Sequence, residues 1–390
     1  MDQNIEIIQR SAEKIAKWVE IHNYKGYEPF DGLSSYLRPL TFNNTFLEQV
    51  LQQIIRRTPF NLRKILAVKP NESTKGRGYM AWGYMNMFEL TKEQEYKDKA
   101  FECLDWLDKN KSPFYEHHSW GNHFDYSARS GKLPKFEPTI VWTSLIGHAF
   151  VKAYELFKNE DHLNVIKSIV RWIKELPKEE TDQGTCLSYI AYDLNPVHNS
   201  NMLGASFLSK YAKITGDEEA LKIAREAMLY SCSRQLDNGA WYYGHAEKYH
   251  WIDNFHTGYN LDSLKYYIDY SGNKEFHENL INGYKFWKEH FFEESGRPKY
   301  YYNNTFPVDI QCASQAIDTF ALFSTLDNEA LSLATKVAIW TINNMQDKKD
   351  GHMYFRIYSI GKKVKVPMIH WGQATTFKAL TFLLNKLSSK

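Results

Sequence analysis

The sequence has few cysteines, and they stand far apart. Four occur in 390 residues, at Cys103, Cys186, Cys232 and Cys312, and no two form a CxxC pair. A disulfide framework needs closely and regularly spaced cysteines, and a thiolate zinc site needs paired ones, so the spacing argues against both. We therefore expect no cofactor and no metal ion.

The sequence also lacks a charge excess and any long apolar run. Its 48 basic and 46 acidic residues leave a formal charge of +2, so no overall field attracts nucleic acid or an anionic membrane, although local basic patches stay possible. No stretch reaches about 18 uncharged apolar residues, and residues 1–20 carry charges throughout, unlike a signal peptide. These features predict a cytoplasmic location, no nucleic-acid partner and no membrane insertion, and they leave the oligomeric state open.

Aromatic residues are abundant instead. The chain has 26 Tyr, 23 Phe and 11 Trp, which together make 15% of its residues. Aromatic faces stack on the C–H faces of sugar rings and on apolar chains, so the excess suits a carbohydrate or lipid ligand. A large aromatic core between helices explains the same number, and both interpretations stay open.

One amphipathic helix recurs five times along the chain. Each copy follows a short polar turn and places an aromatic residue about ten positions into the pattern. The copies span residues 91–107, 158–173, 215–232, 271–287 and 325–340, with the aromatic residues at Trp106, Trp172, Tyr230, Trp287 and Trp340. A fixed period that contains a helix is typical of solenoids and helical rings.

A second kind of helix precedes each copy and is apolar over much of its circumference, which predicts burial on several sides. Six such inner helices are expected, within residues 78–90, 138–157, 199–214, 256–270, 310–324 and 371–387. The sixth has no outer partner after it, but residues 5–20 carry the outer pattern. Packing the first helix beside the last would close the ring.

The sequence thus predicts an all-α fold, an (α/α)6 toroid that forms one domain over residues 1–390, with an excursion at 24–74 over or beside the central funnel. An open superhelix is the alternative. Short β-hairpins are expected in the long connections at 237–254, 296–309 and 351–371, all at one mouth of the ring.

Polar and titratable residues recur where these connections meet the inner helices. Asp253 and Asp309 are candidates for acid and base, because glycosyl transfer to water needs one of each. His256 and His370 are further candidates for proton transfer. The candidates for substrate binding are Lys75, Arg77, Glu137, His198, Asn199, Trp241, Tyr259, Trp371 and Gln373.

Simpler interpretations compete with these roles. Aspartates at helix starts are ordinary N-caps, and a histidine in a packed helix is more often a structural hydrogen-bonding group. Asp31 is either a turn residue or a ligand contact. A group of basic residues could hold a carboxylate or phosphate, or form a solvated face: Arg38, Arg56, Arg57, Lys75 and Arg77.

Three resemblances add to this interpretation. The whole chain resembles the (α/α)6 toroids of unsaturated glucuronyl hydrolases, polysaccharide lyases and sugar epimerases, a kinship that does not fix the reaction. The segments YEPFDGLSS, PFNLRKIL, DNFHTGYNLDSL and HWGQATTFKAL resemble uncharacterised bacterial and archaeal toroid proteins encoded with surface-polysaccharide genes, which implies a glycan context. QLDNGAW resembles the QW-type repeat of squalene cyclases, and FHTGYNLDSL is similar to the zinc-histidine segment of protein prenyltransferase β subunits.

The third resemblance would make His256 a zinc ligand, but the sequence departs from that family. The family has Asp and Cys one repeat upstream, where this chain has His198 and Ser200. A zinc site from His198, His256 and a carboxylate is left as an alternative.

We therefore predict a carbohydrate-active enzyme of the glycoside hydrolase, lyase or epimerase type, with no cofactor. Its expected substrate is an acidic polysaccharide or a lipid-linked oligosaccharide in surface-polysaccharide metabolism. A non-catalytic glycan-binding or scaffold protein and a prenyltransferase-like enzyme are the alternatives.

Overall fold

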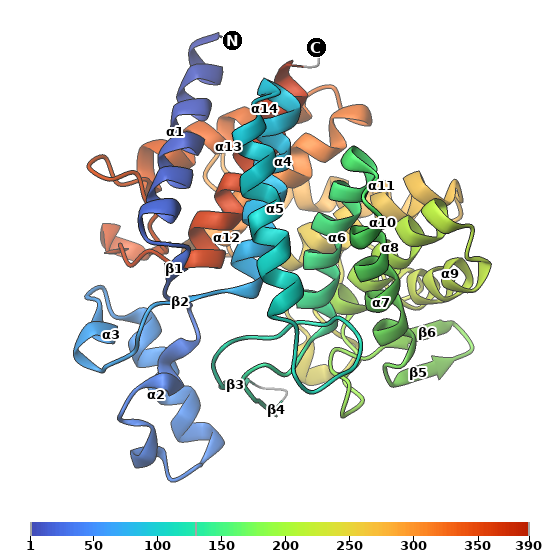
Figure 1. The fold of residues 1–390 in the computed structure, drawn as a ribbon, viewed down its shortest axis with the longest axis horizontal. Helices are drawn as coiled ribbons and strands as arrows, with labels where there is room; N and C mark the ends of the chain where they lie inside the picture. Colours follow the sequence, from blue (N-terminus) through green and yellow to red (C-terminus); the bar gives the residue numbers. More distant parts are fainter. Residues whose placement is uncertain (1, 129–130, 389–390) are drawn as a thin grey trace.

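Six inner helices close into a ring in the computed structural model, which describes residues 2–128 and 131–388 (Figure 1). Each inner helix contacts the next one along the chain, and the last contacts the first. They are α4 (Thr74–Thr91), α6 (Ile140–Phe157), α8 (His198–Thr215), α10 (Asn254–Ser271), α12 (Ile310–Leu322) and α14 (Thr375–Ser388). The predicted (α/α)6 toroid is confirmed, and the open superhelix is excluded.

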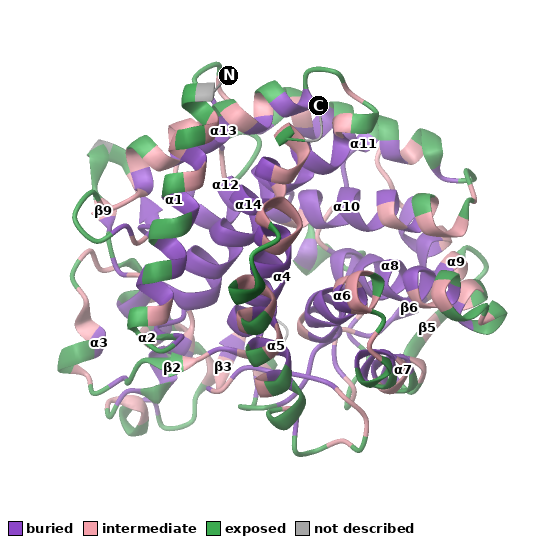
Figure 2. Ribbon diagram, turned by 45° about the horizontal axis from the view of Figure 1, so that its top comes forward, coloured by how far each residue is buried: buried purple, intermediate pink, exposed green. Residues whose placement is uncertain are grey.

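An outer helix packs on each inner helix. The outer helices are α5 (Gln94–Lys109), α7 (Glu160–Lys174), α9 (Glu218–Cys232), α11 (His277–His290), α13 (Ala330–Met345) and α1 (Asp2–Ile21). α1 packs against α13 and α14, so both chain ends lie at the same end of the ring (Figure 1). Figure 2 shows mostly buried inner helices behind outer helices with exposed faces. No helix in the described residues is long and apolar enough to cross a membrane.

Glycines let neighbouring inner helices approach closely. A Cβ at Gly83 of α4 would lie 2.4 Å from Cδ1 of Phe377 in α14, and one at Gly147 of α6 would lie 2.5 Å from Phe207 in α8. The aromatic ring of one helix therefore packs directly on the backbone of the next. The contact between Gly83 and Phe377 joins the first and the last inner helix, and we call it the seam.

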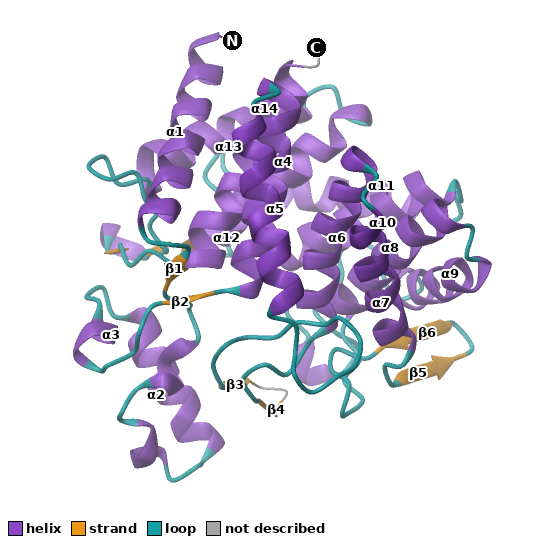
Figure 3. Cartoon of the chain, viewed as in Figure 1, coloured by secondary structure: helices purple, strands orange, loops and turns teal. Residues whose placement is uncertain are grey.

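The long connections lie at the ring end where the inner helices begin, which we call the mouth (Figure 3). Short antiparallel strands pair there, with β3 next to β4, β5 next to β6, and β8 between β7 and β9. Their bounds are β3 (Tyr126–Ala128), β4 (Gly131–Leu133), β5 (Lys178–Thr181), β6 (Gly184–Leu187), β7 (Val308–Asp309), β8 (Arg356–Ile357) and β9 (Lys363–Val364). Other short helices in connections include the 3-10 helices η4 (Phe323–Thr325) and η5 (Ser359–Gly361) and the π-helix η6 (Ile369–Ala374).

The predicted hairpin at 351–371 is present as β8 and β9, and 296–309 contributes only β7. The hairpin expected at 237–254 is wrong: all of that segment is described, and it holds η3 (Glu247–Tyr249) and no strand. Its alternating aromatic residues pack on one another instead of lining a sheet face. Tyr242 stacks on His250 with ring centroids 4.1 Å apart, and Tyr243 stacks on Trp251 at 4.5 Å.

The excursion at residues 24–74 forms a lobe beside the mouth (Figure 1). It contains β1 (Lys25–Gly26), η1 (Asp31–Ser34), η2 (Arg38–Thr41), α2 (Thr45–Arg57), α3 (Leu62–Ile65) and β2 (Asn71–Glu72). β1 and β2 pair at its neck. Gln52 of α2 exchanges two hydrogen bonds of 2.9 Å with the backbone of Ser127. Asp31 forms a buried ion pair of 2.8 Å with Arg63, so it holds the excursion together.

Candidate active site

The His256 imidazole is held at the start of α10 by the carboxylate of Asp253. Asp253 is the N-cap of α10, and its Oδ1 accepts a hydrogen bond of 3.0 Å from the His256 backbone N–H. Its Oδ2 lies 2.7 Å from His256 Nδ1 and accepts a bond from Trp251 Nε1. A carboxylate at Nδ1 favours the proton there and leaves Nε2 to accept one. The His256 side chain is 22% exposed whereas that of Asp253 is buried, so a ligand reaches the imidazole.

A second imidazole, His370 of η6, is paired with Glu28 of the excursion. Both side chains are buried, and Glu28 Oε2 is in ion-pair contact with His370 Nδ1. The contact forms because the backbone N–H of Ile369 donates to the carbonyl of Tyr27 at 2.8 Å. Burial alone would raise the pKa of Glu28, but the charge and hydrogen bond of His370, together with His123 and Ser73, lower this pKa overall. Burial lowers the pKa of His370, although Glu28 opposes the shift.

The Lys75 ammonium lies close to this pair. Its Nζ sits 4.5 Å from the ring centroid of Trp142, and the Trp142 ring is 5.6 Å from that of His370. Burial lowers the pKa of Lys75 to about 7, with the nearby charge of Glu28 opposing the change. A lysine with this pKa is present in both its protonated and its neutral form near pH 7, whereas an exposed lysine is almost entirely protonated there.

Aromatic rings connect the two imidazoles. The Phe255 ring lies 4.0 Å from that of His256 and 5.4 Å from that of Trp371. The Trp371 ring in turn lies 5.6 Å from that of His370. The two imidazoles thus belong to one continuous cluster of aromatic rings at the mouth.

Tyr259 lies one turn below His256 and forms part of the floor. Its ring is 6.4 Å from that of His256 and 5.8 Å from Lys75 Nζ. Its hydroxyl accepts a hydrogen bond of 2.9 Å from Gln311 Nε2 and lies 3.2 Å from the hydroxyl of Tyr79. The floor therefore consists of hydrogen-bonded side chains from three inner helices.

Asp309 is fully engaged by other groups. Its Oδ1 accepts bonds of 2.8 Å from the Gln311 backbone N–H and from Trp371 Nε1. Its Oδ2 is ion-paired with Arg356 Nε of β8. The N-capping interpretation is confirmed for Asp309, and the structure gives it the further task of orienting Trp371. Asp253 is likewise committed to His256, so neither carboxylate is available as a free acid or base.

Two predicted binding residues face the outer ring instead of the mouth. The Arg77 guanidinium lies 3.6 Å from the ring centroid of Tyr24 and is ion-paired with Glu72. His198 Nδ1 lies 3.3 Å from Ser231 Oγ of α9. Burial lowers the pKa of His198 to about 3, so this imidazole is neutral.

Of the other predicted binding residues, some are bound to neighbouring groups of the protein and others line the recess near His256. Gln373 exchanges hydrogen bonds of 2.7 and 2.9 Å with the backbone of Met353 and fixes the loop before β8. Glu137 accepts a bond of 2.7 Å from the Tyr115 hydroxyl. Asn199 and Trp241 line the same recess as Asp253 and His256.

Two residues of this mouth were not predicted from the sequence. Glu28 lies outside the repeat, and His123 lies in the connection between α5 and α6. Burial lowers the pKa of His123, whereas the charge of Glu28 raises it, so His123 belongs to the electrostatic environment of the Glu28–His370 pair.

A separate charged cluster lies deeper in the ring, one turn beyond Tyr259. Asp318 forms a buried ion pair with Lys378, and Gln315 Nε2 donates to Asp262 Oδ2 at 2.7 Å. Burial, followed by the charge of Asp318, raises the pKa of Asp262 to about 8. These residues line a cavity of ≈ 30 Å³, which has room for about two water molecules.

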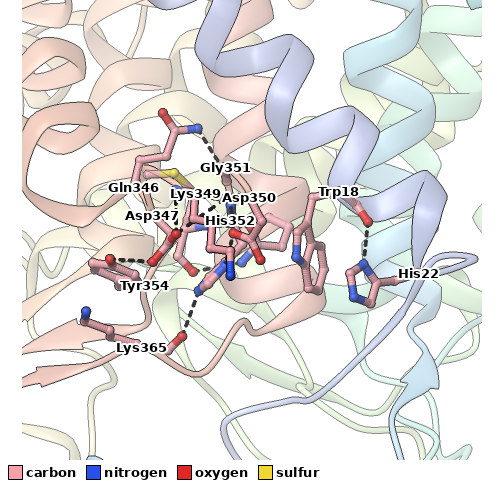
Figure 4. A network of polar contacts seen from close by, with 12 residues as sticks. Trp18, His22, Gln346, Asp347, Lys349, Asp350, Gly351, His352, Tyr354 and Lys365 are labelled. Carbon is pink, nitrogen blue, oxygen red and sulfur yellow. Dashed lines mark hydrogen bonds and ion pairs between the residues drawn. The ribbon is translucent and has the colours of Figure 1, made fainter.

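One group of possible metal ligands occurs elsewhere in the described residues, between α13 and β8 (Figure 4). Asp347, Asp350 and His352 have ligand atoms within 4.8 Å of one another. Their polar atoms are already engaged: Asp347 accepts bonds from two backbone N–H groups and from Tyr354, and His352 contacts Asp350 and the Lys365 carbonyl. The group therefore stabilises a turn.

Comparisons with known proteins identify the fold. No family model and no curated protein matches the sequence. A cellobiose 2-epimerase from Spirochaeta thermophila is similar with a TM-score of 0.65 at 10% identity, over 82% of this chain and 88% of that one. A GH76 alpha-mannanase from Bacteroides thetaiotaomicron has a TM-score of 0.63 at 12% identity, over 81% and 87%. A D-mannose isomerase has 0.60 at 11% identity, over 82% and 88%. The chain shares the (α/α)6 toroid with these enzymes, and a shared fold does not fix the reaction.

Proposed function

We propose that the protein is a saccharide epimerase or isomerase that moves a proton at the carbon next to a carbonyl group. The observation that carries this proposal is the presence, at one mouth, of two imidazoles that are each held by a buried carboxylate. Asp253 holds His256, and Glu28 holds His370. The names of two fold neighbours, a cellobiose 2-epimerase and a D-mannose isomerase, support it.

The reaction needs a base and an acid near one carbon of an open-chain sugar. One imidazole takes the proton from the carbon beside the carbonyl, and the C–H electron pair forms an enediolate with the negative charge on the carbonyl oxygen. The other imidazole returns a proton. Return to the opposite face of the same carbon gives the epimer, whereas return to the former carbonyl carbon, with a hydroxyl proton moving between the oxygens, gives the ketose isomer. Because the reaction is reversible, His256 and His370 exchange roles with its direction.

Other groups at the mouth suit the same chemistry. In its protonated form, Lys75 places a positive charge near His370, where it stabilises the oxygen that becomes negative in the enediolate. Trp142 is partly exposed, and it offers a face for stacking a sugar ring.

Hydrolysis by two carboxylates is less well supported. Asp253 and Asp309 are bound by His256, Arg356 and Trp371. The deeper carboxylates line a cavity of ≈ 30 Å³, which is small for a sugar ring. An alpha-mannanase does share the fold, so release of shorter saccharides is an outcome that the test must detect.

The experiment is incubation of the protein with reducing mono- and disaccharides, including mannose and cellobiose, followed by NMR of the products. We expect new epimers or ketoses without chain cleavage. His256→Asn and His370→Asn should each lower turnover by about 10²- to 10⁴-fold while saccharide binding persists. The exposed His277 of α11 gives a matched control, His277→Asn, which should leave turnover unchanged. Binding without conversion by the unaltered protein would instead indicate a glycan-binding protein and refute the proposal.

A role in surface-polysaccharide metabolism and a lipid-linked or acidic substrate remain predictions from the sequence.

A further inference from the structure

Two buried guanidinium groups, those of Arg56 and Arg356, lie near the Phe355 ring at 5.7 and 5.0 Å from its centroid. Arg356 Nε is ion-paired with Asp309, whose oxygens also accept bonds from Trp371 and Gln311. Arg56 of α2 is the second cation of this pair. Burial and then the charge of Arg356 lower the pKa of Arg56 to about 10, with Asp309 opposing the change. Asp309 is ion-paired with Arg356 and acts on Arg56 only through its charge.

Arg56 is buried without a full set of partners. Arg56 is 8% exposed, and its Nε has no hydrogen-bond partner among the described residues. The guanidinium carbon lies 4.4 Å from the ring centroid of Phe30 and 5.7 Å from that of Phe355. Stacking on aromatic rings offsets part of the cost of removing a cation from water, but a buried cation that lacks an anion is strongly unfavourable. The environment of Arg56 is therefore incomplete without a further anion.

A second donor near these two cations is also unpartnered. The Tyr358 hydroxyl is buried and has no hydrogen-bond partner in the part of the chain that the structure describes. Tyr358 is close enough to both Arg56 and Arg356 to interact with their charges. Buried hydroxyls nearly always have a partner, so an unpaired hydroxyl beside an unpaired guanidinium marks a position for one acceptor group.

This position adjoins the proposed active site. The Phe30 ring, on which the Arg56 guanidinium stacks, lies 6.1 Å from the Trp371 ring. The Arg356 guanidinium lies 5.0 Å from the Tyr300 ring, which is 5.9 Å from that of Phe255. Trp371 and Phe255 are the rings that connect the two imidazoles. An anion at Arg56 would therefore lie next to the rings that connect the two imidazoles.

We propose that Arg56 and Tyr358 bind an oxyanion carried by the saccharide substrate, so that the enzyme acts on an acidic sugar. This inference rests on the proposed function. The group that the site takes is a uronic-acid carboxylate or a phosphate ester, because both accept hydrogen bonds from a guanidinium and a hydroxyl.

The test compares saccharides that differ only in their acidic group. One series consists of glucuronate, glucose 6-phosphate and glucose, and a second series consists of the equivalent mannose derivatives. We expect at least one acidic sugar to have a higher kcat/KM than its neutral counterpart. The acidic sugar with the highest kcat/KM shows whether the site takes a carboxylate or a phosphate. Arg56→Gln and Tyr358→Phe should lower kcat/KM for that sugar by roughly ten- to hundredfold, chiefly through KM, and leave the neutral sugar unchanged. Arg57→Gln, at the exposed neighbour on α2, is the matched control.

Direct binding by calorimetry separates this inference from the proposed function. If no conversion occurs but glucuronate or glucose 6-phosphate binds to the wild type and not to Tyr358→Phe, the oxyanion site stands and the catalytic proposal fails. Equal affinity for acidic and neutral sugars, or acidic-sugar binding that survives Tyr358→Phe and a folded Arg56→Gln, would overturn the inference.

Discussion

The seam between the first and the last inner helix can be tested by adding a single methyl group. In a helix, Gly→Ala normally stabilises a protein by about 0.5–1 kcal/mol because glycine loses more backbone entropy on folding. At Gly83, the added Cβ would lie 2.4 Å from Cδ1 and 2.6 Å from Cε1 of Phe377, well inside van der Waals contact. Inserting a methyl group into a packed core costs about 1–3 kcal/mol. Gly83→Ala should therefore reduce the free energy of unfolding by a net amount of up to about 2.5 kcal/mol.

A second substitution isolates the contact. Phe377→Ala alone removes a buried aromatic ring and should cost about 3–5 kcal/mol. In the Phe377→Ala background the methyl group at position 83 no longer meets a ring, so Gly83→Ala should become neutral or stabilising. Urea denaturation followed by far-UV circular dichroism gives the four free energies of the double-mutant cycle. If Gly83→Ala stabilised the chain that retains Phe377, the two helices would not be in contact and the closed ring would be refuted.

Two further predictions concern buried titratable groups. Lys75→Met removes an amine whose pKa is about 7 in the folded protein and higher in the unfolded chain, so the unfolded state binds more protons above pH 7. The stability of the wild type relative to Lys75→Met should therefore rise between pH 7 and 10 in urea titrations, and a constant difference would contradict the lowered pKa. All four cysteines are buried, and burial raises the pKa of Cys103 to about 11, so thiol titration should find no fast-reacting group in the native protein and four after denaturation. A thiol that reacts at once under native conditions would show that the helix or strand that carries it opens in the native protein.

The ring was predictable because its signals repeat. The outer helices each carry an aromatic residue at the same position, and Trp172 and Trp287 are buried as that periodicity requires. The inner helices lack a polar face, and only a closed arrangement covers them on all sides. In contrast, the segment at 237–254 had the alternation of a hairpin, but its aromatic side chains gain more by stacking on one another than by pairing strands.

The site was less predictable because its partners come from outside the repeat. The sequence pointed to Asp253, His256, Asp309 and His370, and it proposed the two aspartates as acid and base. It could not indicate that Glu28 of the excursion pairs with His370, since no period relates these positions. It also could not indicate that Arg356 and Trp371 would occupy Asp309. These contacts are the reason why our proposal gives the proton-carrying role to the imidazoles and not to the carboxylates.

The most direct test of the proposed chemistry is solvent deuterium exchange at the sugar carbon. The protein is incubated in D2O with the acidic or neutral saccharide that gives the highest turnover, and ¹H NMR follows the signal of the hydrogen on the carbon beside the carbonyl. Proton transfer through His256 and His370 predicts that deuterium enters this carbon in product and recovered substrate, and that His256→Asn and His370→Asn abolish the exchange. Product that keeps its original hydrogen at every carbon, as expected when water cleaves a glycosidic bond, would contradict the account.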